Sequence, residues 1–182
     1  MKRGLAALAA AVTLGVTAWA APAAATTAPY CGIRWGSLPK QAEGPGSGHL
    51  TNVRAGQHAC FDRLVLDVSG GQARTYWVSY VPEVRTDGAG FLVPLRGGAK
   101  LSVTVAAPAH DASYRPTYRP PNSAELVAVG GYRTFRQVAW AGSFEGSSTV
   151  GLGVRARLPY RVFVLAGPGT GSRVVIDVAH RW

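Results

Sequence analysis

The sequence predicts an all-β protein, an antiparallel β-sandwich of about eight or nine short strands. From residue 50 to the end, apolar and polar residues alternate with a period of two. Glycine-rich turns such as 69–71, 97–98 and 167–171 separate these stretches at short intervals. No long stretch keeps the periodicity of a helix. A flattened barrel is the alternative arrangement of the same strands.

The expected strands follow from this alternation and these turns. They cover residues 63–68, 75–81, 91–95, 100–105, 126–129, 135–141, 149–158, 161–165 and 173–179. The clearest alternation lies in 149–158, where every second residue from 150 onward is apolar or alanine. Arg155 and Arg157 belong to the other set of positions. This pattern predicts a half-buried strand with a basic outer face.

Two strands share one motif, an arginine followed by three apolar residues, an aspartate and a valine. The motif occurs at 63–68 and again at 173–178. If the two strands pair antiparallel, the arginine of each can meet the aspartate of the other across the ladder. We interpret the motif as a structural ion pair, with a role in ligand binding as the alternative.

The first residues have the layout of a secretory signal peptide. Lys2 and Arg3 precede an apolar run that is shorter than the ~20 residues of a membrane span, and small residues fill 21–25. We therefore expect residues 1–25 to be removed, and a retained signal anchor is the alternative. The mature chain would be secreted, with no transmembrane segment. It would comprise a Gly/Pro-rich segment at 26–49 and a β-sandwich domain at 50–182.

The mature chain contains two cysteines, Cys31 and Cys60. In an oxidising compartment they are expected to form one disulfide that closes a loop of about 29 residues. The bond would hold the Gly/Pro-rich stretch 43–48 against the first strand. A metal site of Cys60 with His49 and His58 is the alternative, but this spacing matches no zinc pattern.

The charge of the chain is strongly positive. Removing Lys2 and Arg3 from the 19 basic residues leaves 17 against 9 acidic ones, a net charge of +8. Sixteen of the 19 are arginine, which pairs bidentately with carboxylate and phosphate. For an exported protein, nucleic acid is a poor expectation, and the anions outside a cell are wall polymers, peptidoglycan carboxylates and lipid headgroups. Solubility and arginine-rich codon usage explain the same charge without a partner.

The stretch 108–122 is rich in proline and expected to be an extended surface loop. It carries Tyr114, Arg115, Tyr118 and Arg119. Tyrosine rings stack on sugars and guanidinium groups bind anions, so these side chains are a candidate recognition surface. A solvated connecting loop is the alternative.

No motif for catalysis is present. The sequence has neither a Gly-x-Ser-x-Gly elbow nor a His-Glu-x-x-His pair. Glu125 and Glu145 would suit a glycosidase only if the fold brought them together, and no pattern predicts this. We therefore expect no catalytic residues, no metal and no cofactor. Trp140 is expected to lie in the core rather than on a binding surface.

Several segments together resemble the AMIN-like domain of secreted actinobacterial proteins. They lie at 31–38, 53–65, 93–101, 135–140 and 174–178, and the resemblance spans 50–182. It implies a β-sandwich without catalytic function, associated with the cell wall. More distantly similar AMIN domains localise periplasmic amidases and secretion pores by binding peptidoglycan. The sequence shows no such amidase or secretin domain, and the family motif identifies no individual binding residues.

The function expected from these observations is a secreted, non-catalytic module that binds peptidoglycan or an anionic wall polymer. The candidate surfaces are the face of Arg155 and Arg157 and the loop at 108–122. The alternative is a module that recognises an envelope protein through its sheet edge or its Pro-rich loop. An unrecognised hydrolase is a third possibility.

Overall fold

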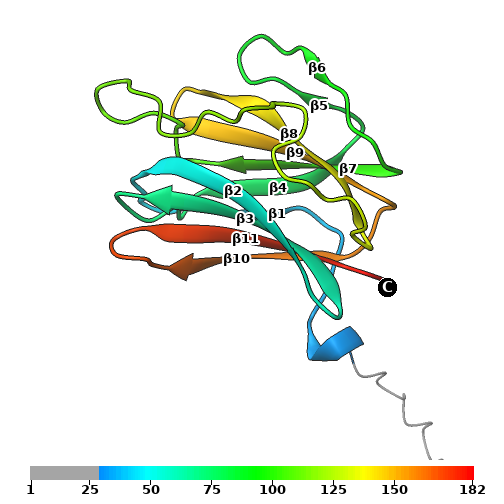
Figure 1. Ribbon diagram of the computed structural model, residues 1–182. Helices are drawn as coiled ribbons and strands as arrows, with labels where there is room; N and C mark the ends of the chain where they lie inside the picture. The colour runs from blue at the N-terminus through cyan, green and yellow to red at the C-terminus, as the bar shows by residue number, and fades with distance from the viewer. Residues whose placement is uncertain (1–28) are drawn as a thin grey trace, which may run out of the picture.

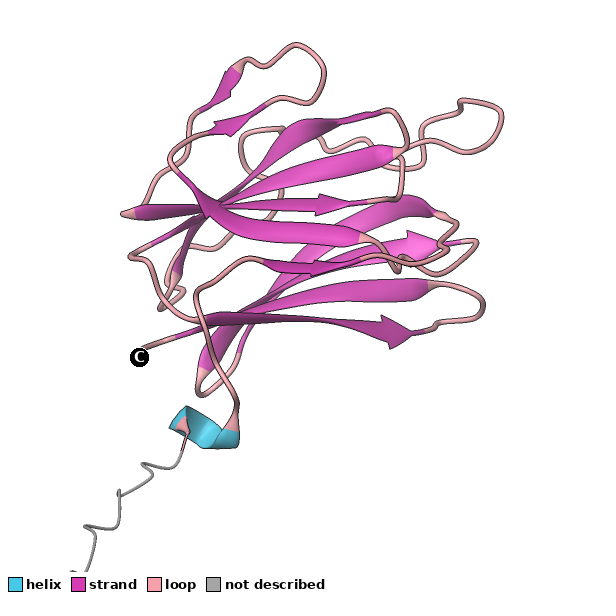
Figure 2. Ribbon diagram, turned by 180° about the vertical axis from the view of Figure 1, so that it is seen from behind, coloured by secondary structure: helices cyan, strands magenta, loops and turns pink. Residues whose placement is uncertain are grey.

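The computed structural model describes residues 29–182, and the expected signal peptide lies outside these residues. Two antiparallel sheets pack face to face (Figure 1 and Figure 2). The first sheet has the order β1 (Lys40–Ala42), β4 (Tyr76–Val81), β7 (Ala99–Val105), β9 (Ser147–Val154), β8 (Phe135–Phe144). The second has the order β10 (Tyr160–Ala166), β11 (Ser172–Ala179), β3 (Phe61–Ser69), β2 (His49–Gln57). The predicted all-β sandwich is confirmed, with eleven strands rather than eight or nine.

The remaining elements are short. Strands β5 (Val84–Arg85) and β6 (Leu92–Val93) form a separate hairpin, and a 3-10 turn, η1, spans Tyr30–Gly32. The hydrophobic core fills the space between the two sheets, because alternate side chains of each sheet point inward. Its largest fully buried aliphatic residues include Leu64, Leu66, Leu101, Leu152 and Ile176.

Three strands escaped prediction: β1, β2 and β5. In β2 the register shifts between Leu50 and Asn52, and a bulge of this kind breaks the alternation by which strands are recognised. The strand expected at 126–129 is wrong. These residues lie in the long connection 106–134, where the Leu126 amide donates to the carbonyl of Val138 at 2.8 Å without forming a ladder.

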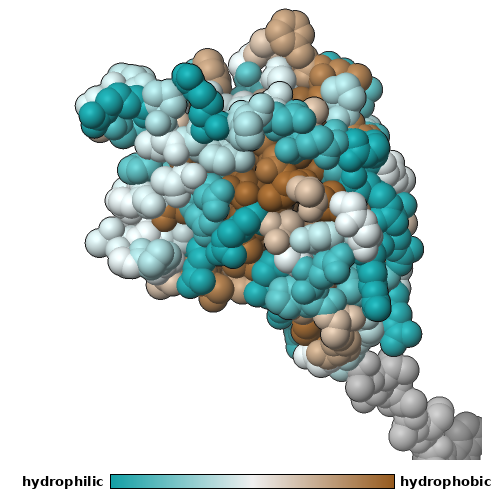
Figure 3. Space-filling view, in the orientation of Figure 1, coloured by the Kyte–Doolittle hydropathy of each residue, from teal (hydrophilic) through white to brown (hydrophobic). Residues whose placement is uncertain are grey.

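The connection 106–134 covers the open side between β2 and β8. The Leu50 amide of β2 donates to the Pro108 carbonyl at 2.8 Å, and the Trp140 amide of β8 donates to the Ser123 carbonyl at 2.7 Å. Trp140 is half-buried and packs against the core. Figure 3 shows an apolar area in the middle of an otherwise mostly hydrophilic face. Both strands on this side of the sandwich are thus protected from pairing with another chain.

Strand β9 is buried on both faces, so the predicted half-buried strand with a basic outer face is wrong. Segment 84–96 lies over its outer positions, where Gly151 and Gly153 leave no room for a side chain. A Cβ atom on Gly153 would collide with the carbonyl oxygen of Arg96. The strand ends at Val154, and the two arginines at 155 and 157 therefore follow it rather than project from it.

The strands with the repeated motif pair antiparallel in the predicted register. Arg63 lies opposite Asp177, and Arg173 lies opposite Asp67. The first pair forms an ion pair of 2.6 Å, whereas Asp67 pairs with Arg54 of β2 instead. The expected cross-strand interaction is thus confirmed at one of the two positions.

The N-terminal segment is part of the sandwich. Strand β1 pairs with β4, and the Tyr160 amide at the start of β10 donates to the Gly36 carbonyl at 2.8 Å. The Tyr160 hydroxyl lies 2.9 Å from the carbonyl oxygen of Leu38. Residues 36–42 therefore join the first sheet to the second on the side opposite the long connection.

Candidate functional site

A basic cleft of about 360 Å³ lies where β4 ends and β7 begins. We define it by its lining residues Tyr80, Val81, Pro82, Gly98, Ala99, Lys100 and Arg157. The antiparallel ladder places Val81 opposite Lys100, and the chain returns past them after β9 to contribute Arg157. Gly98 packs so closely on the backbone of Arg155 that a larger residue would not fit.

The guanidinium group of Arg157 lies over an aromatic ring. Its Cζ atom is 4.7 Å from the centroid of the Tyr80 ring, and its Nη2 donates to the Ser37 carbonyl at 3.1 Å. The Tyr80 hydroxyl donates to the Leu158 carbonyl at 2.7 Å, which fixes the ring. Burial raises the pKa of Tyr80, so its hydroxyl stays neutral at physiological pH. The cleft thus has a rigid aromatic wall with a cation held against it.

The charge of the basic cleft is not neutralised from within. Among its lining residues Lys100 and Arg157 are cationic and none is acidic. A larger cleft of about 630 Å³ differs in this respect, because there Arg96 is paired with Glu125. The basic cleft can therefore offer both positive charges to an anion from solution.

Arg155 lies beside the basic cleft, at an end of the sandwich where a chain of hydrogen bonds connects the C-terminal residues to β3 and β8. Its Nη2 donates to the His180 carbonyl, and its side chain is exposed. His180 in turn contacts the fully buried Asp62 at 3.1 Å. The other carboxylate oxygen of Asp62 accepts a hydrogen bond of 2.6 Å from the Thr134 amide. Arg155 thus extends a positive surface from the cleft toward the C-terminus.

The loop residues predicted to bind a ligand have different environments. Tyr114 is 82% exposed and stacks on His110 at a centroid distance of 5.0 Å. Arg115 forms an ion pair of 2.9 Å with Asp111. Hydrogen bonds from the Arg115 amide, the Ser113 amide and the Arg115 side chain lower the pKa of Asp111. The charge of Arg115 is therefore largely compensated within the loop.

The other two loop residues also differ from each other. Tyr118 is half-buried and packs edge-on against Trp140, with ring centroids 5.3 Å apart. Arg119 is exposed. Tyr118 therefore belongs to the protein's own packing, whereas Tyr114 and Arg119 remain available at the surface.

The structure does not bring the two candidate surfaces together. Arg155 follows Val154 at one end of β9. The loop leaves β7 at Val105, whose partner in the ladder is Ser148 at the other end of β9. The basic cleft and the loop thus lie toward opposite ends of the first sheet.

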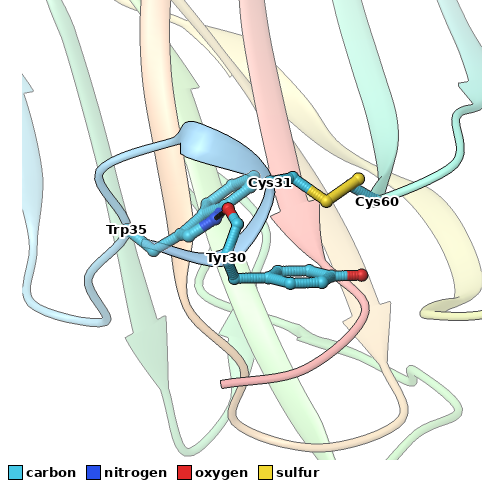
Figure 4. Close-up of a disulfide and its surroundings, with 4 residues drawn as sticks. All are labelled: Tyr30, Cys31, Trp35 and Cys60. Carbon is cyan, nitrogen blue, oxygen red and sulfur yellow. Dashed lines mark hydrogen bonds between the residues drawn. A yellow bond between two sulfur atoms is a disulfide. The ribbon is translucent and has the colours of Figure 1, made fainter. Parts of the chain in front are cut away.

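The predicted disulfide between Cys31 and Cys60 is present, with Cα atoms 6.4 Å apart. It joins η1 to the start of β3 (Figure 4). The Trp35 indole donates to the Tyr30 carbonyl at 2.8 Å, and its ring lies 6.0 Å from that of Phe61. Because Cys60 is bonded, it has no free thiolate for a metal.

The outer face of the second sheet carries a cluster that the sequence only partly indicated. Asp177, which is fully buried, accepts hydrogen bonds from Arg63 at 2.6 and 2.9 Å and from Arg161 at 2.8 Å. Both guanidinium groups lie over aromatic rings, namely those of Trp35, Phe61 and Phe163. The repeated motif identified Arg63 in its copy at 63–68 and Asp177 in its copy at 173–178, but no local pattern identified Arg161.

Two further observations concern residues 29–182. No group of three His, Cys, Asp or Glu side chains in this range is arranged to hold a metal ion. Within the same range no helix has the length and apolar character needed to cross a membrane.

The chain matches the family described as AMIN-like domain over residues 48–180, well over half of its length. None of the curated proteins and none of the solved structures gives a match. The matched range contains β2 to β11, and so every strand of both sheets except β1. The chain therefore belongs to the AMIN-like domain family, whose members are in general non-catalytic modules associated with the cell wall.

Proposed function

We propose that this protein is a secreted module that binds an anionic polymer of the cell wall in the basic cleft. The observation that carries the proposal is the convergence of Lys100 and Arg157 on a cleft with no acidic lining residue. The net charge of the chain without Lys2 and Arg3, 17 basic residues against 9 acidic ones or +8, attracts polyanions over a longer range. Either carboxylate groups of peptidoglycan or the charged groups of an attached polymer would provide the required chemistry.

The geometry of the cleft suits a chain of charged sugars. The Tyr80 ring is fixed by its hydroxyl and carries the Arg157 guanidinium on its face, so a cation is already in place for a charged group of the sugar chain. Arg157 lies over this ring and retains donors that can reach a carboxylate or phosphate. Arg155 would contact the next charged group along the polymer.

The loop at 108–122 is a second candidate contact. Tyr114 stacks on His110 and is almost fully exposed, and Arg119 is exposed nearby in the sequence. Because Arg115 is paired with Asp111 and Tyr118 packs inside, we expect those two residues to contribute little. A polymer long enough to pass both ends of the sheet could touch the loop and the cleft together.

Substitution of the cleft arginines tests the proposal. In co-sedimentation with purified wall sacculi, we expect Arg157→Ala to weaken binding about tenfold, which corresponds to about 1.4 kcal/mol. Arg155→Ala combined with it should weaken binding further and flatten the salt dependence. Arg74→Ala is the matched control, because Arg74 is exposed and precedes β4 at the end remote from the cleft. Equal binding by the double variant and the control would remove the cleft from the proposed function.

A further inference from the structure

Strand β10 is an uncovered edge of the second sheet. It pairs with β11 on one side, and beyond the contact of Tyr160 with Gly36 no described residue pairs with its other side. Both ribbon views show β10 as the outermost strand of its sheet, with the N-terminal segment passing its beginning and open space beyond the rest of it (Figure 1 and Figure 2). The edges β2 and β8 are covered by the connection 106–134, and β1 has only three residues.

The backbone of this edge points its hydrogen-bonding groups outward at alternate residues. The Tyr160 amide donates away from β11, to Gly36, whereas the Pro159 carbonyl accepts from the Ala179 amide of β11. In an antiparallel ladder, successive residues point their N–H and C=O groups alternately toward one neighbouring strand and toward the other side. The pairing of β10 with β11 continues without a register shift, so this alternation holds along the whole strand. The N–H and C=O groups of Val162 and Val164 therefore face the free side. Unpaired groups of this kind are a template for another strand.

The side chains beside this edge are cationic and apolar. Arg161, Phe163 and Leu165 point to the outer face of the sheet, and Leu165 is 37% exposed. The inward set, Val162 and Val164, packs against the core. In a strand added beside β10, every second side chain would lie opposite Arg161, Phe163 or Leu165, because directly opposed residues of paired strands point to the same face of the sheet.

The charges of the outer face are unbalanced. It carries four arginines and two aspartates: Arg54, Arg63, Arg161, Arg173, Asp67 and Asp177. Both aspartates are already engaged, Asp67 by Arg54 and Asp177 by Arg63 and Arg161. Arg161 uses its Nε and Nη2 atoms for Asp177 and is 33% exposed, so its Nη1 is left for a further anion.

We propose that β10 binds an extended acidic segment of another protein, which adds to the sheet as an antiparallel strand. Val162 and Val164 supply the backbone hydrogen bonds. A carboxylate of the segment lies opposite Arg161, and apolar side chains lie opposite Phe163 and Leu165. This site is separate from the basic cleft and takes a peptide rather than a wall polymer.

A second copy of the chain fits this edge less well. Antiparallel pairing of two β10 strands about Phe163 would place Arg161 opposite Leu165 and supply no acidic side chain. Each copy also carries a large positive charge, which disfavours association. An acidic partner removes both difficulties.

Amide hydrogen exchange tests the proposal on the unmodified, oxidised chain. In the free protein we expect rapid exchange at Val162 and Val164 and slow exchange at Phe163 and Leu165. The probe is the peptide acetyl-Thr-Val-Thr-Val-Thr-Glu-amide, whose glutamate falls opposite Arg161 in the antiparallel register and which ends before the place that Gly36 occupies beside Tyr160. At millimolar concentration it should slow exchange at Val162 and Val164 at least tenfold. The same peptide with lysine in place of glutamate should bind at least tenfold more weakly.

Two methylated peptides provide controls that leave the protein unchanged. N-methylation of the threonine opposite Val164 removes a hydrogen bond to the edge and should abolish protection. N-methylation of the valine opposite Phe163 should preserve most of it, because that amide points away from β10. Arg157→Ala should leave peptide binding unchanged, which separates this site from the cleft.

Several results would overturn the proposal. Absence of protection at Val162 and Val164 with the glutamate peptide would do so, as would protection confined to another edge. Equal binding of the glutamate and lysine peptides would refute an acidic partner. Slow exchange at both valines in the free protein, together with a dimer in sedimentation velocity, would assign the edge to a second copy.

Discussion

Replacement of Asp177 by asparagine should destabilise the fold far more than the same replacement at Asp67. The two aspartates occupy equivalent places in the repeated motif and lie on the same outer face. Asp177, however, is completely buried and binds Arg63 and Arg161, whereas the Asp67 side chain is 22% exposed and binds Arg54. Asparagine keeps the shape of the side chain and removes the charge, so the comparison isolates the ion pairs.

The magnitude follows from the exposure of the arginines. Removing one partner of a buried ion pair costs about 3–5 kcal/mol, because a charge is left without compensation. The side chains of Arg63 and Arg161 are 24% and 33% exposed, so water recovers part of this loss. We expect Asp177→Asn to lower the free energy of unfolding by about 2–3 kcal/mol. For a chain of this size that is a fall in Tm of roughly 5–10 °C.

The assay is urea unfolding of the oxidised chain near neutral pH, followed by tryptophan fluorescence. Asp67→Asn is the control, and its ion pair, with Arg54 49% exposed, should contribute less than about 1 kcal/mol. Equal losses of stability in the two variants would refute the reasoning that burial of Asp177 makes its interactions strong. A changed m-value would show that the variant no longer unfolds in the same two-state manner.

Further predictions concern the disulfide, a closely packed glycine and one carboxylate. The double variant Cys31→Ser with Cys60→Ser should lose roughly 3–4 kcal/mol in urea unfolding, and an unchanged midpoint would contradict the chain-entropy argument. Gly153→Ala should lower the free energy of unfolding by several kcal/mol, on the order of the larger overpacking effects, or prevent folding. Gly130→Ala is the control: no atom lies near its added Cβ, so its thermal unfolding should be unchanged. Burial raises the pKa of Asp87 above its ordinary value of 3.8, so the folded state binds the carboxyl proton more tightly than the unfolded state does. The fold therefore loses stability as the pH rises from 3.8 through the raised pKa of the folded state. Asp87→Asn should therefore stabilise the fold at pH 7 but not below pH 3.8, and a constant difference between the variants across this range would contradict the cause.

The sandwich could be predicted because most inward positions carry aliphatic residues and most turns carry glycine. The register of β3 and β11 could be predicted from one motif, because pairing the arginine of each strand with the aspartate of the other fixes which residues lie opposite each other. Strand β2 was missed because its bulge disrupts the alternation. Residues 126–129 were mistaken for a strand because a loop that seals the core is as apolar as a short strand.

The candidate site was less predictable, because tertiary contacts decide which arginines are free. The alternation in β9 suggested a basic face, but Gly151 and Gly153 there make room for another segment rather than for solvent. Arg157 still lies in a cleft, with Lys100 and Tyr80 as neighbours that no local pattern indicates. Likewise Arg161 meets Asp177 only because β10 and β11 are adjacent.

Co-sedimentation of the oxidised chain with purified sacculi, across a salt series, tests the central claim most directly. The sacculi are used both with their anionic polymers and after these have been stripped. We predict binding that weakens steeply as salt rises, since exposed charges are screened within about 8 Å at physiological ionic strength. Binding lost on stripping would identify the attached polymer, and binding retained would identify peptidoglycan carboxylates. No binding at low salt, or binding that salt leaves unchanged, would contradict a basic cleft that recognises a wall polyanion.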